Sequence, residues 1–325
     1  MKVLDFHNHF YPQAYIDAVK SGPTVLEVWT DDDSNPVLGY PGDYNVIVPG
    51  HRDIERRKQD CDAAGVDNQI LTFTSPATHV EAPTRAVELA KIVNDEFKTI
   101  TDEQDRFEAL GTLPLCNPEA SVTEFERLST ELGFKGVMVF SNINGVALAD
   151  ERFWPLYESA NDKQAVLMIH PTYPIGVEAM LDYWLMPLIG FTMDTTLAAA
   201  KIVFSGVAER FPDIRWVLGH LGGAIPYLAE RLDRGFEAFA DCRVNIEKPP
   251  SEYLRNFYYD SVNFDLNALK LALDFAGVDR LVAGSDYPHK IGSLEKMMWS
   301  IDQLDLSEED RDKILFGNAC GLLGK

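Results

Sequence analysis

The 325-residue sequence predicts an α/β protein folded as a (β/α)8 TIM barrel with a long insertion after the first strand. Eight short apolar runs, rich in β-branched and aromatic residues, recur along the chain. Most of them are separated by segments with helical spacing, and eightfold strand–helix alternation is typical of a parallel barrel. A doubly wound sheet is disfavoured, because no Gly-rich turn follows the first strand and GHLGGA lacks the G-x-G-x-x-G spacing.

The predicted elements alternate in order along the chain. The strands are VLDFHNH (3–9), NQILTFT (68–74), FEALGTL (107–113), FKGVMVF (134–140), AVLMIH (165–170), IRWVLGH (214–220), NFYYDSV (256–262) and RLVAGSD (280–286). The clearest helical patterns are PTRAVELAKIVNDEFKTITDE (83–103), PEASVTEFERLSTEL (118–132), TTLAAAKIVFSGVAERF (195–211) and LNALKLALDFAG (266–277).

Two segments interrupt this alternation within one predicted domain that spans residues 1–325. Residues 10 to about 50 form an excursion rich in Pro, Gly and Asp before a helix that begins near Asp53. Residues 171–195 form a second irregular stretch. In a barrel such insertions lie on the C-terminal face, where they can cover a site.

Composition narrows the range of partners. The chain has 29 basic and 51 acidic side chains, a formal net charge of −22, which disfavours phosphate backbones and anionic lipid surfaces. Nucleic acid and membranes are therefore not expected as partners. The chain has no signal-peptide pattern at its start and no long uninterrupted apolar run, so a cytoplasmic location is expected. The four cysteines form no CxxC pair and indicate neither a zinc knuckle nor a disulfide framework.

The histidines indicate chemistry at one end of the barrel. In LDFHNHF, His7 and His9 stand two residues apart in a strand, so both imidazoles leave the same face. His170 ends the fifth predicted strand, His220 the sixth and Asp286 the eighth. The C-terminal ends of barrel strands face one rim, so these five groups predict a metal site there.

The other three histidines stand in predicted loops. We expect His51, His79 and His289 to be solvated or to face substrate rather than to bind metal. Of these only His289, three residues after Asp286 in GSDYPH, is expected near the site.

An ordered set of motifs resembles the amidohydrolase superfamily, in particular its aminocarboxymuconate-semialdehyde decarboxylase branch of nonoxidative decarboxylases. The motifs are DFHNHFYP, MIHPTYP, VLGHLGGAIPYLAERLDRG, GSDYP and ILFGNACGLLG, and they span the chain from the first strand to the last helix.

The resemblance implies that His7, His9, His170 and Asp286 are metal ligands and that His220 handles a proton beside the metal. This donor set suits one divalent ion, with Zn²⁺ expected first and Mn²⁺ as the other candidate. The fourth strand ends in MVFSN, which offers Ser141 and Asn142 where binuclear relatives place a carboxylated lysine. One metal ion per chain is therefore expected.

Residues that would bind substrate are less clearly marked. The arginine that helps to bind the substrate carboxylate in the resembling family has no clear counterpart here. The nearby candidates are Arg52, Arg56 and Arg57 in HRDIERR. On a helix, these side chains could equally be solvated charges. His289 stands where the family often has an aromatic residue. Aromatic side chains of the second cover, Tyr173, Tyr183 and Trp184, are candidates to contact a ring.

The sequence thus predicts a metal-dependent decarboxylase of a small unsaturated or aromatic carboxylic acid, with His220 or Asp286 as the general acid. The alternative is a metal-dependent hydrolase or hydratase acting on a lactone, amide or unsaturated acid. A catalytically silent metal-binding barrel is a third candidate.

Arg231, in the motif after His220, is expected to bind the substrate anion. In the resembling family the arginine at this position reaches across a dimer interface. A helix outside a barrel cannot easily turn its own arginine into its own pocket. The protein is therefore expected to be a homodimer with shared sites.

Overall fold

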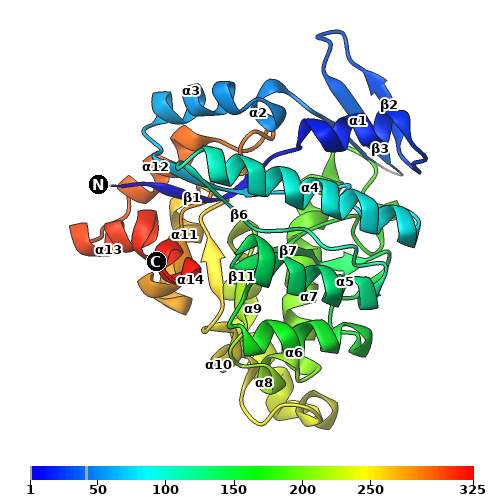
Figure 1. Cartoon of the computed structure of the whole chain (residues 1–325). Coiled ribbons are helices and arrows are strands. Elements are labelled where there is room, and N and C mark those ends of the chain that lie inside the picture. The colour runs from blue at the N-terminus through cyan, green and yellow to red at the C-terminus, as the bar shows by residue number, and fades with distance from the viewer. Residues whose placement is uncertain (1, 41–42) are drawn as a thin grey trace.

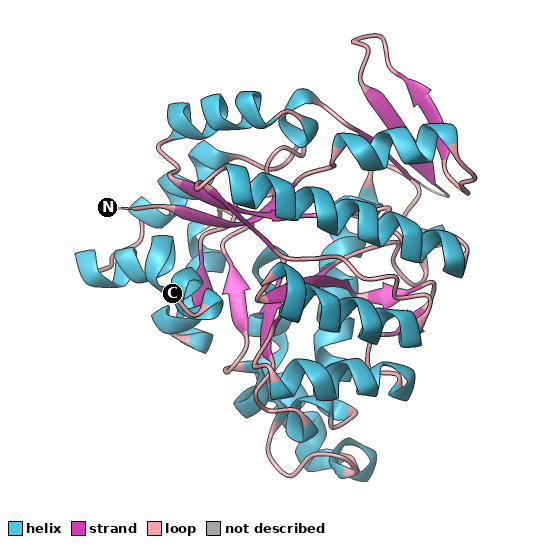
Figure 2. Ribbon diagram, in the orientation of Figure 1, coloured by secondary structure: helices cyan, strands magenta, loops and turns pink. Residues whose placement is uncertain are grey.

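The computed structural model describes residues 2–40 and 43–325. Within them eight strands pair in parallel, and Figures 1 and 2 show strands at the centre of the molecule with helices around them. The strands are β1 (Leu4–His9), β5 (Asn68–Thr72), β6 (Phe107–Ala109), β7 (Gly136–Phe140), β10 (Val166–His170), β11 (Arg215–Leu218), β12 (Tyr258–Asp260) and β13 (Leu281–Val282). Each lies inside one of the eight runs predicted as strands.

Backbone hydrogen bonds close these strands into a barrel. Regular pairing gives two parallel groups, in the orders β1–β5–β6 and β7–β10–β11–β12–β13. At one seam Gly111 N–H donates to Gly136 O at 3.1 Å, and at the other Ser285 N–H donates to His7 O at 3.0 Å. Parallel bridges join the same seams, so the predicted (β/α)8 barrel is confirmed.

The helices that follow the strands form the outer layer seen in Figure 1. The long helix α4 has the bounds predicted for it, whereas a π-turn continues α5 and a turn at Ser205–Gly206 separates α7 from α8. The helices are α1 (Gln13–Ser21), α2 (Pro49–Arg52), α3 (Ile54–Ala64), α4 (Pro83–Glu103), α5 (Pro118–Arg127), α6 (Trp154–Asp162), α7 (Phe191–Phe204), α8 (Val207–Arg210), α9 (Ile225–Ala238), α10 (Pro250–Leu254), α11 (Leu266–Ala276), α12 (Leu294–Asp302), α13 (Glu308–Asp312) and α14 (Asn318–Leu323).

Local sequence explains where α3 begins and ends. The Asp53 carboxylate accepts hydrogen bonds from the backbone N–H groups of Glu55 and Arg56, which otherwise would lack partners at the first turn. At the other end Gly65 adopts a φ of 74°, the left-handed conformation that commonly ends a helix. The predicted start near Asp53 is therefore correct.

Two irregular segments lie above the C-terminal ends of the strands. The first contains a three-stranded antiparallel sheet, β2 (Glu27–Thr30), β3 (Pro36–Tyr40) and β4 (Asp43–Val46), where the sequence predicted only an excursion. Figure 1 shows β2 and β3 projecting from the barrel. The second contains the short turns η3 (Val177–Ala179) and η4 (Met186–Gly190) before α7.

One helical stretch, Met186–Phe204, is long and apolar enough by composition to cross a membrane. Core helices of globular proteins pass the same test, and 44% of its most apolar window is buried inside the protein. Its inner face packs in the main core through Ala199, Ile202 and Val203, so it forms part of the barrel wall.

Candidate active site

Five predicted side chains meet at one rim of the barrel. His7 and His9 end β1, and His170 ends β10. His220 and Asp286 lie two and four residues past the last residues of β11 and β13, rather than within these strands as the sequence suggested. All five converge because parallel strands direct their C-terminal ends to the same face.

The inward-facing atoms are close enough to share one ion. His9 Nε2 lies 3.2 Å from His7 Nε2 and 3.0 Å from Asp286 Oδ1. The Asp286 Oδ2 atom lies 3.7 Å from His220 Nε2. One ligand atom each of His7, His170, His220 and Asp286 lies within 4.8 Å of the others. His9 belongs to a second such group, with Asp286 and His289, so Asp286 joins the two.

The outer nitrogens of three imidazoles are held by hydrogen bonds that orient the rings. His7 Nδ1 contacts the Asp260 carboxylate, His170 Nδ1 lies 2.7 Å from Pro171 O, and His9 Nδ1 lies 3.1 Å from Thr72 Oγ1. Because Asp260 and Pro171 O can only accept, His7 and His170 carry hydrogen on Nδ1, so each presents a lone pair on Nε2 in its neutral form. His170 Nε2 has no hydrogen-bond partner among the described residues. Such outer partners are typical of metal-binding imidazoles.

Asp260 is a site residue that the sequence reasoning missed. Its carboxylate accepts hydrogen bonds from the backbone N–H groups of His220 at 2.9 Å and Leu221 at 2.7 Å, besides the bond from His7. These bonds hold His220 and Leu221 at φ values of 54° and 56°. Gly284 makes room, because a Cβ there would lie 2.9 Å from His7 Cβ and 3.0 Å from Asp260 Cβ. The sequence signal for Asp260 was a lone carboxylate in the seventh predicted strand, comparable to Asp286 in the eighth.

Burial and mutual contact set the charge state of the cluster. Desolvation holds the pKa values of His9 and His170 well below the usual range, which keeps these imidazoles neutral. Burial would raise the pKa of Asp286, but contacts with His220 and His9 outweigh it and hold that pKa well below its usual range. Burial would lower the pKa of His7, but the contact with Asp260 outweighs it and raises that pKa. His9, His170 and Asp286 therefore already have the protonation states that a divalent metal requires, whereas His7 would have to lose its extra proton when it binds one.

Arg57 is buried and hydrogen-bonds the end of β1, so its interpretation as a solvated charge is wrong. The side chain is fully buried, and its pKa is lowered by desolvation. Its guanidinium donates to the carbonyl oxygens of His9 and Gly50 and, at 2.6 Å, to Asn8 Oδ1. Helix position alone could not reveal this, because the burial of α3 depends on the loops packed over it.

A cavity of about 440 Å³ opens above the cluster. His170, His220 and Asp286 form its floor, and its walls are largely apolar. The other residues that line it are Tyr40, Tyr44, Asn45, Val46, Val48, His51, Thr74, Ser75, Trp184, Pro187, Leu188, Phe191, Pro288, His289, Lys290 and Ile291. An apolar pocket with a few convergent polar groups is typical of a small-molecule site.

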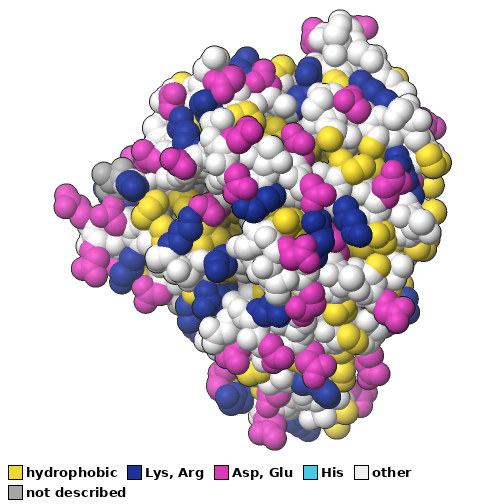
Figure 3. All heavy atoms as spheres, in the orientation of Figure 1, with side chains coloured by type: hydrophobic (Ala, Val, Ile, Leu, Met, Phe, Trp, Pro, Cys, Tyr) yellow, Lys and Arg dark blue, Asp and Glu magenta, His cyan; other side chains and the backbone are white. Residues whose placement is uncertain are grey.

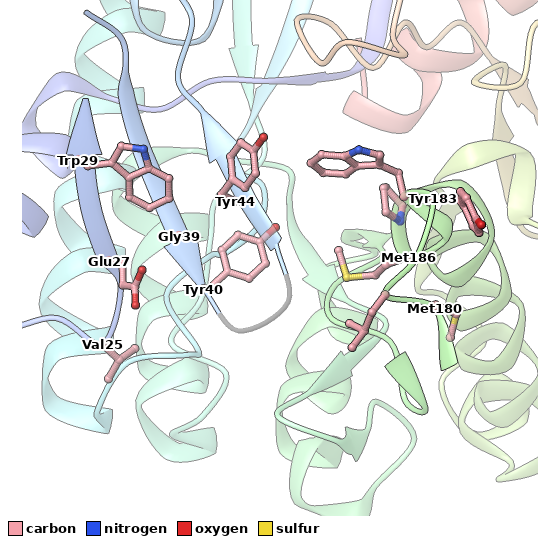
Figure 4. A pocket seen from close by; sticks show the side chains of 12 residues that line it. Val25, Glu27, Trp29, Gly39, Tyr40, Tyr44, Met180, Tyr183 and Met186 are labelled. Atoms are coloured by element: carbon pink, nitrogen blue, oxygen red, sulfur yellow. The ribbon is translucent and has the colours of Figure 1, made fainter. Parts of the chain in front are cut away.

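A second hollow of about 610 Å³ lies between the β2–β4 sheet and the segment before α7 (Figure 4). Trp29, Tyr40 and Tyr44 come from the sheet, and Met180 and Met186 come from the opposite side. Tyr40, Tyr44, Trp184 and Pro187 line both spaces, so the two covers meet above the cavity.

The predicted substrate-binding residues divide into two groups. Trp184 and His289 line the cavity. The described residues that line the cavity do not include Arg52, Tyr173 or Arg231. Arg52 instead donates a hydrogen bond to Ile47 O at 3.3 Å, and Arg231 is exposed on α9. Tyr183 is 87% exposed and lines only the outer hollow.

The two remaining histidines are buried rather than solvated. His51 agrees with the alternative of a substrate-facing residue, although only His289 was expected near the site, and His79 agrees with neither alternative. His51 lies in α2 and faces the cavity, with its ring centroid 5.0 Å from that of His289. His79 packs against Phe140, with ring centroids 4.9 Å apart, and does not line the cavity.

Comparison with known proteins assigns the chain to a family. The model of the family described as Amidohydrolase matches residues 4–325. This chain belongs to the amidohydrolase family. It is 34% identical over 276 residues to the 2-amino-3-carboxymuconate-6-semialdehyde decarboxylase of Dictyostelium discoideum, a match covering 84% of this chain and 77% of that protein.

Two further relatives are decarboxylases of aromatic acids. The gamma-resorcylate decarboxylase of Polaromonas sp. (strain JS666 / ATCC BAA-500) is 30% identical over 283 residues, which cover 82% of this chain and 86% of that protein. The crystal structure of a dihydroxybenzoic acid decarboxylase from Polaromonas sp. JS666, with bound manganese and the inhibitor 2-nitroresorcinol, superposes with a TM-score of 0.84 at 26% identity and covers 99% of this chain and 97% of that one. The predicted family and reaction class are confirmed.

Proposed function

We propose that this chain catalyses the nonoxidative, metal-dependent decarboxylation of a small aromatic carboxylic acid. The observation that carries the proposal is the set of imidazole Nε2 atoms and one ionised carboxylate at the floor of an apolar cavity. Decarboxylases among the relatives act on dihydroxybenzoic and aminocarboxymuconate-type acids, which are flat and fit such a cavity.

Residues His7, His9, His170 and Asp286 are proposed to hold one divalent ion. The fit rests on the donor set and on the outer hydrogen bonds that turn the Nε2 lone pairs of His7 and His170 inward. Zn²⁺ suits these ligands, and the manganese of the Polaromonas enzyme makes Mn²⁺ the other candidate. When bound, the ion supplies a Lewis acid that neutralises the substrate carboxylate.

The chain's own groups then orient the ring and supply a proton. Trp184, Phe191 and Leu188 line the cavity and can contact a flat ring while they exclude water. His220 lies beside Asp286, and its Nδ1 atom has no partner among the described residues. These contacts support His220 as the group that delivers the proton replacing the carboxyl group, as the bond between the ring carbon and CO₂ breaks.

The two cover segments, 10–50 and 171–195, are proposed to close the cavity within one domain of residues 1–325. Their shared aromatic residues Tyr44 and Trp184 lie 5.7 Å apart, between ring centroids, above the cavity. Closure would keep water from the reacting carbon.

A second copy of the chain is proposed to complete the site through Arg231. An exposed apolar face, made of Leu188, Ile189, Met193, Leu197 and Tyr227, runs along η4, α7 and α9. Arg231 lies one turn after Tyr227 on α9. Pairing of two such faces would bury the apolar side chains and bring Arg231 to a neighbouring subunit. A cytoplasmic homodimer is the form we propose.

Metal analysis combined with a screen of hydroxybenzoates and muconate-type acids tests the function. We expect about one divalent ion per chain and CO₂ release, and we expect His7→Ala, His9→Ala or Asp286→Ala to lose the ion together with activity. Two tightly bound ions would contradict the mononuclear site. Incorporation of solvent oxygen into a product, without CO₂, would instead indicate hydrolysis or hydration.

A further inference from the structure

His51 is a buried imidazole on the wall of the cavity, and none of the roles above uses it. Only 1% of its surface is exposed, and it lines the cavity together with the ligand candidates His170 and Asp286. It is separated from the metal cluster by His289, whose ring centroid lies 4.8 Å from that of His9 and 5.0 Å from that of His51. A bound ring that reaches from the cluster along this wall would meet His51.

Both ring nitrogens of His51 lack a hydrogen-bond partner among the described residues. Buried polar groups almost always have partners, because a buried donor or acceptor left unpaired opposes folding. A packing role would be filled better by an apolar side chain of similar size. The unpaired nitrogens therefore point to a partner that arrives with the ligand.

The backbone around His51 is fixed, which suits a residue that selects a ligand. Tyr11 N–H donates to His51 O at 2.6 Å, and the buried Arg57 guanidinium holds Gly50 O at 3.0 Å. A Cβ on Gly50 would lie 2.4 Å from the Tyr287 hydroxyl oxygen, so α2 is pressed against the loop that carries His289. A preorganised group of this kind loses little freedom when a ligand binds.

We propose that His51 is a specificity-determining residue that hydrogen-bonds a hydroxyl substituent on the substrate ring, at a position away from the carboxylate held at the metal cluster. The inference rests on the proposed function for the placement of the carboxylate. His51 would recognise the part of the ring that lies away from the carboxylate.

The chemistry of the imidazole favours a hydroxyl over other substituents. Burial, together with His289, His9 and Arg57 nearby, lowers the pKa of His51 well below its usual range, which leaves the ring neutral. A neutral imidazole offers one donor and one acceptor, and a hydroxyl can satisfy either nitrogen. A second carboxylate can only accept, and it would lack a cation here, since Lys290 is the sole Lys or Arg among the described residues lining the cavity.

The test measures binding separately from turnover. Calorimetric titration of the metal-loaded enzyme would compare 2-hydroxybenzoate with 2,3-, 2,4-, 2,5- and 2,6-dihydroxybenzoate. We expect at least one dihydroxybenzoate to bind wild type about tenfold or more tightly than 2-hydroxybenzoate, because a site built to bond a hydroxyl disfavours the analogue that lacks it. His51→Leu should remove this difference, and His51→Asn should retain part of it.

His79→Leu is the matched control, because it replaces another buried histidine that does not line the cavity. It should keep the difference in affinity, while His51→Leu should keep its bound metal and should unfold at no lower temperature than wild type. The proposal is overturned if no dihydroxybenzoate binds more tightly than 2-hydroxybenzoate, if His51→Leu keeps the difference, or if His51→Leu loses its metal. A His51-dependent difference in binding without CO₂ release would leave the inference standing and reject the proposed decarboxylation.

Discussion

His220 is the proposed proton donor of the site. Its backbone is held by Asp260, and its Nε2 lies 3.7 Å from Asp286 Oδ2. We expect His220→Ala to keep most of its metal and to lose about 100-fold or more in kcat, because general acid catalysis typically contributes this much. Elemental analysis and a CO₂ assay on the same preparation measure both effects. Isolation of the variant without metal would identify His220 as a ligand instead.

His79 allows a test of pH-dependent stability away from the metal cluster. Burial lowers its pKa from 6.5 to about 4. A base with a depressed folded-state pKa contributes stability above its unfolded pKa of 6.5, and this contribution is lost as the pH falls through 4. Between pH 6.5 and pH 4, we expect His79 alone to account for about 3 kcal/mol of the loss in the free energy of unfolding. Denaturant unfolding of His79→Leu at each pH should show a correspondingly smaller loss, and equal losses would refute the assignment.

The ligand candidates could be found from the sequence because each stands at or near the end of a recognisable apolar run. Asp260 was missed because the seventh predicted run extends to Val262, whereas β12 ends at Asp260. His51 and Arg57 could not be found, because both lie in a polar segment, HRDIERR, whose pattern resembles a solvated helix. Arg57 is buried by contacts with His9 of β1 and with Tyr287. His51 is buried beside the rings of Tyr11 and His289, and all these partners are distant in sequence.

At the scale of elements, the eight strands were predictable because each lies in a compact apolar run, and β7 and β10 are buried along their whole length. The β2–β4 sheet was not, since its strands are short and lie in a segment whose Asp, Pro and Gly residues resemble a loop. β2 is also largely exposed, so it carries no buried pattern to recognise. The sheet nevertheless positions Tyr44 against Trp184 above the cavity.

The contact between the covers predicts a role for Trp184 in binding. This residue lines both the cavity and the outer hollow. We expect Trp184→Ala to raise KM about tenfold, through loss of an aromatic contact and of part of the cover, with little change in metal content. Tyr183→Ala is the matched control, because Tyr183 is 87% exposed and lines only the outer hollow. Steady-state kinetics with both variants would reject the role if their KM values matched.

At the scale of the whole molecule, the charge distribution raises the question of how an anion is held. The chain carries a net charge of −22, and Figure 3 shows acidic side chains spread over the visible face with basic ones mixed among them. Among the described residues lining the cavity, Lys290 is the only Lys or Arg, and it is exposed. Beyond the metal, a cation from outside the chain would therefore help to retain a carboxylate substrate.

Arg231 is the candidate for that cation, because it is exposed on α9 and has no hydrogen bond or ion pair among the described residues. We expect Arg231→Ala to raise KM steeply while metal content stays intact, since a bidentate guanidinium contact to the substrate would be lost. The matched control is Arg234→Ala, because Arg234 lies on the same helix and is also exposed but pairs with Glu237. It should leave KM unchanged.

Mixed dimers decide whether Arg231 acts across the interface. When Arg231→Ala and His220→Ala chains are unfolded and refolded together, about half of the dimers should contain one chain of each kind. If sites are shared, each mixed dimer has one site with His220 from one chain and Arg231 from the other, so the mixture should recover about a quarter of wild-type activity. If each chain uses its own arginine, every site lacks one of the two groups. Mixed dimers verified by mass spectrometry yet inactive would therefore exclude shared sites.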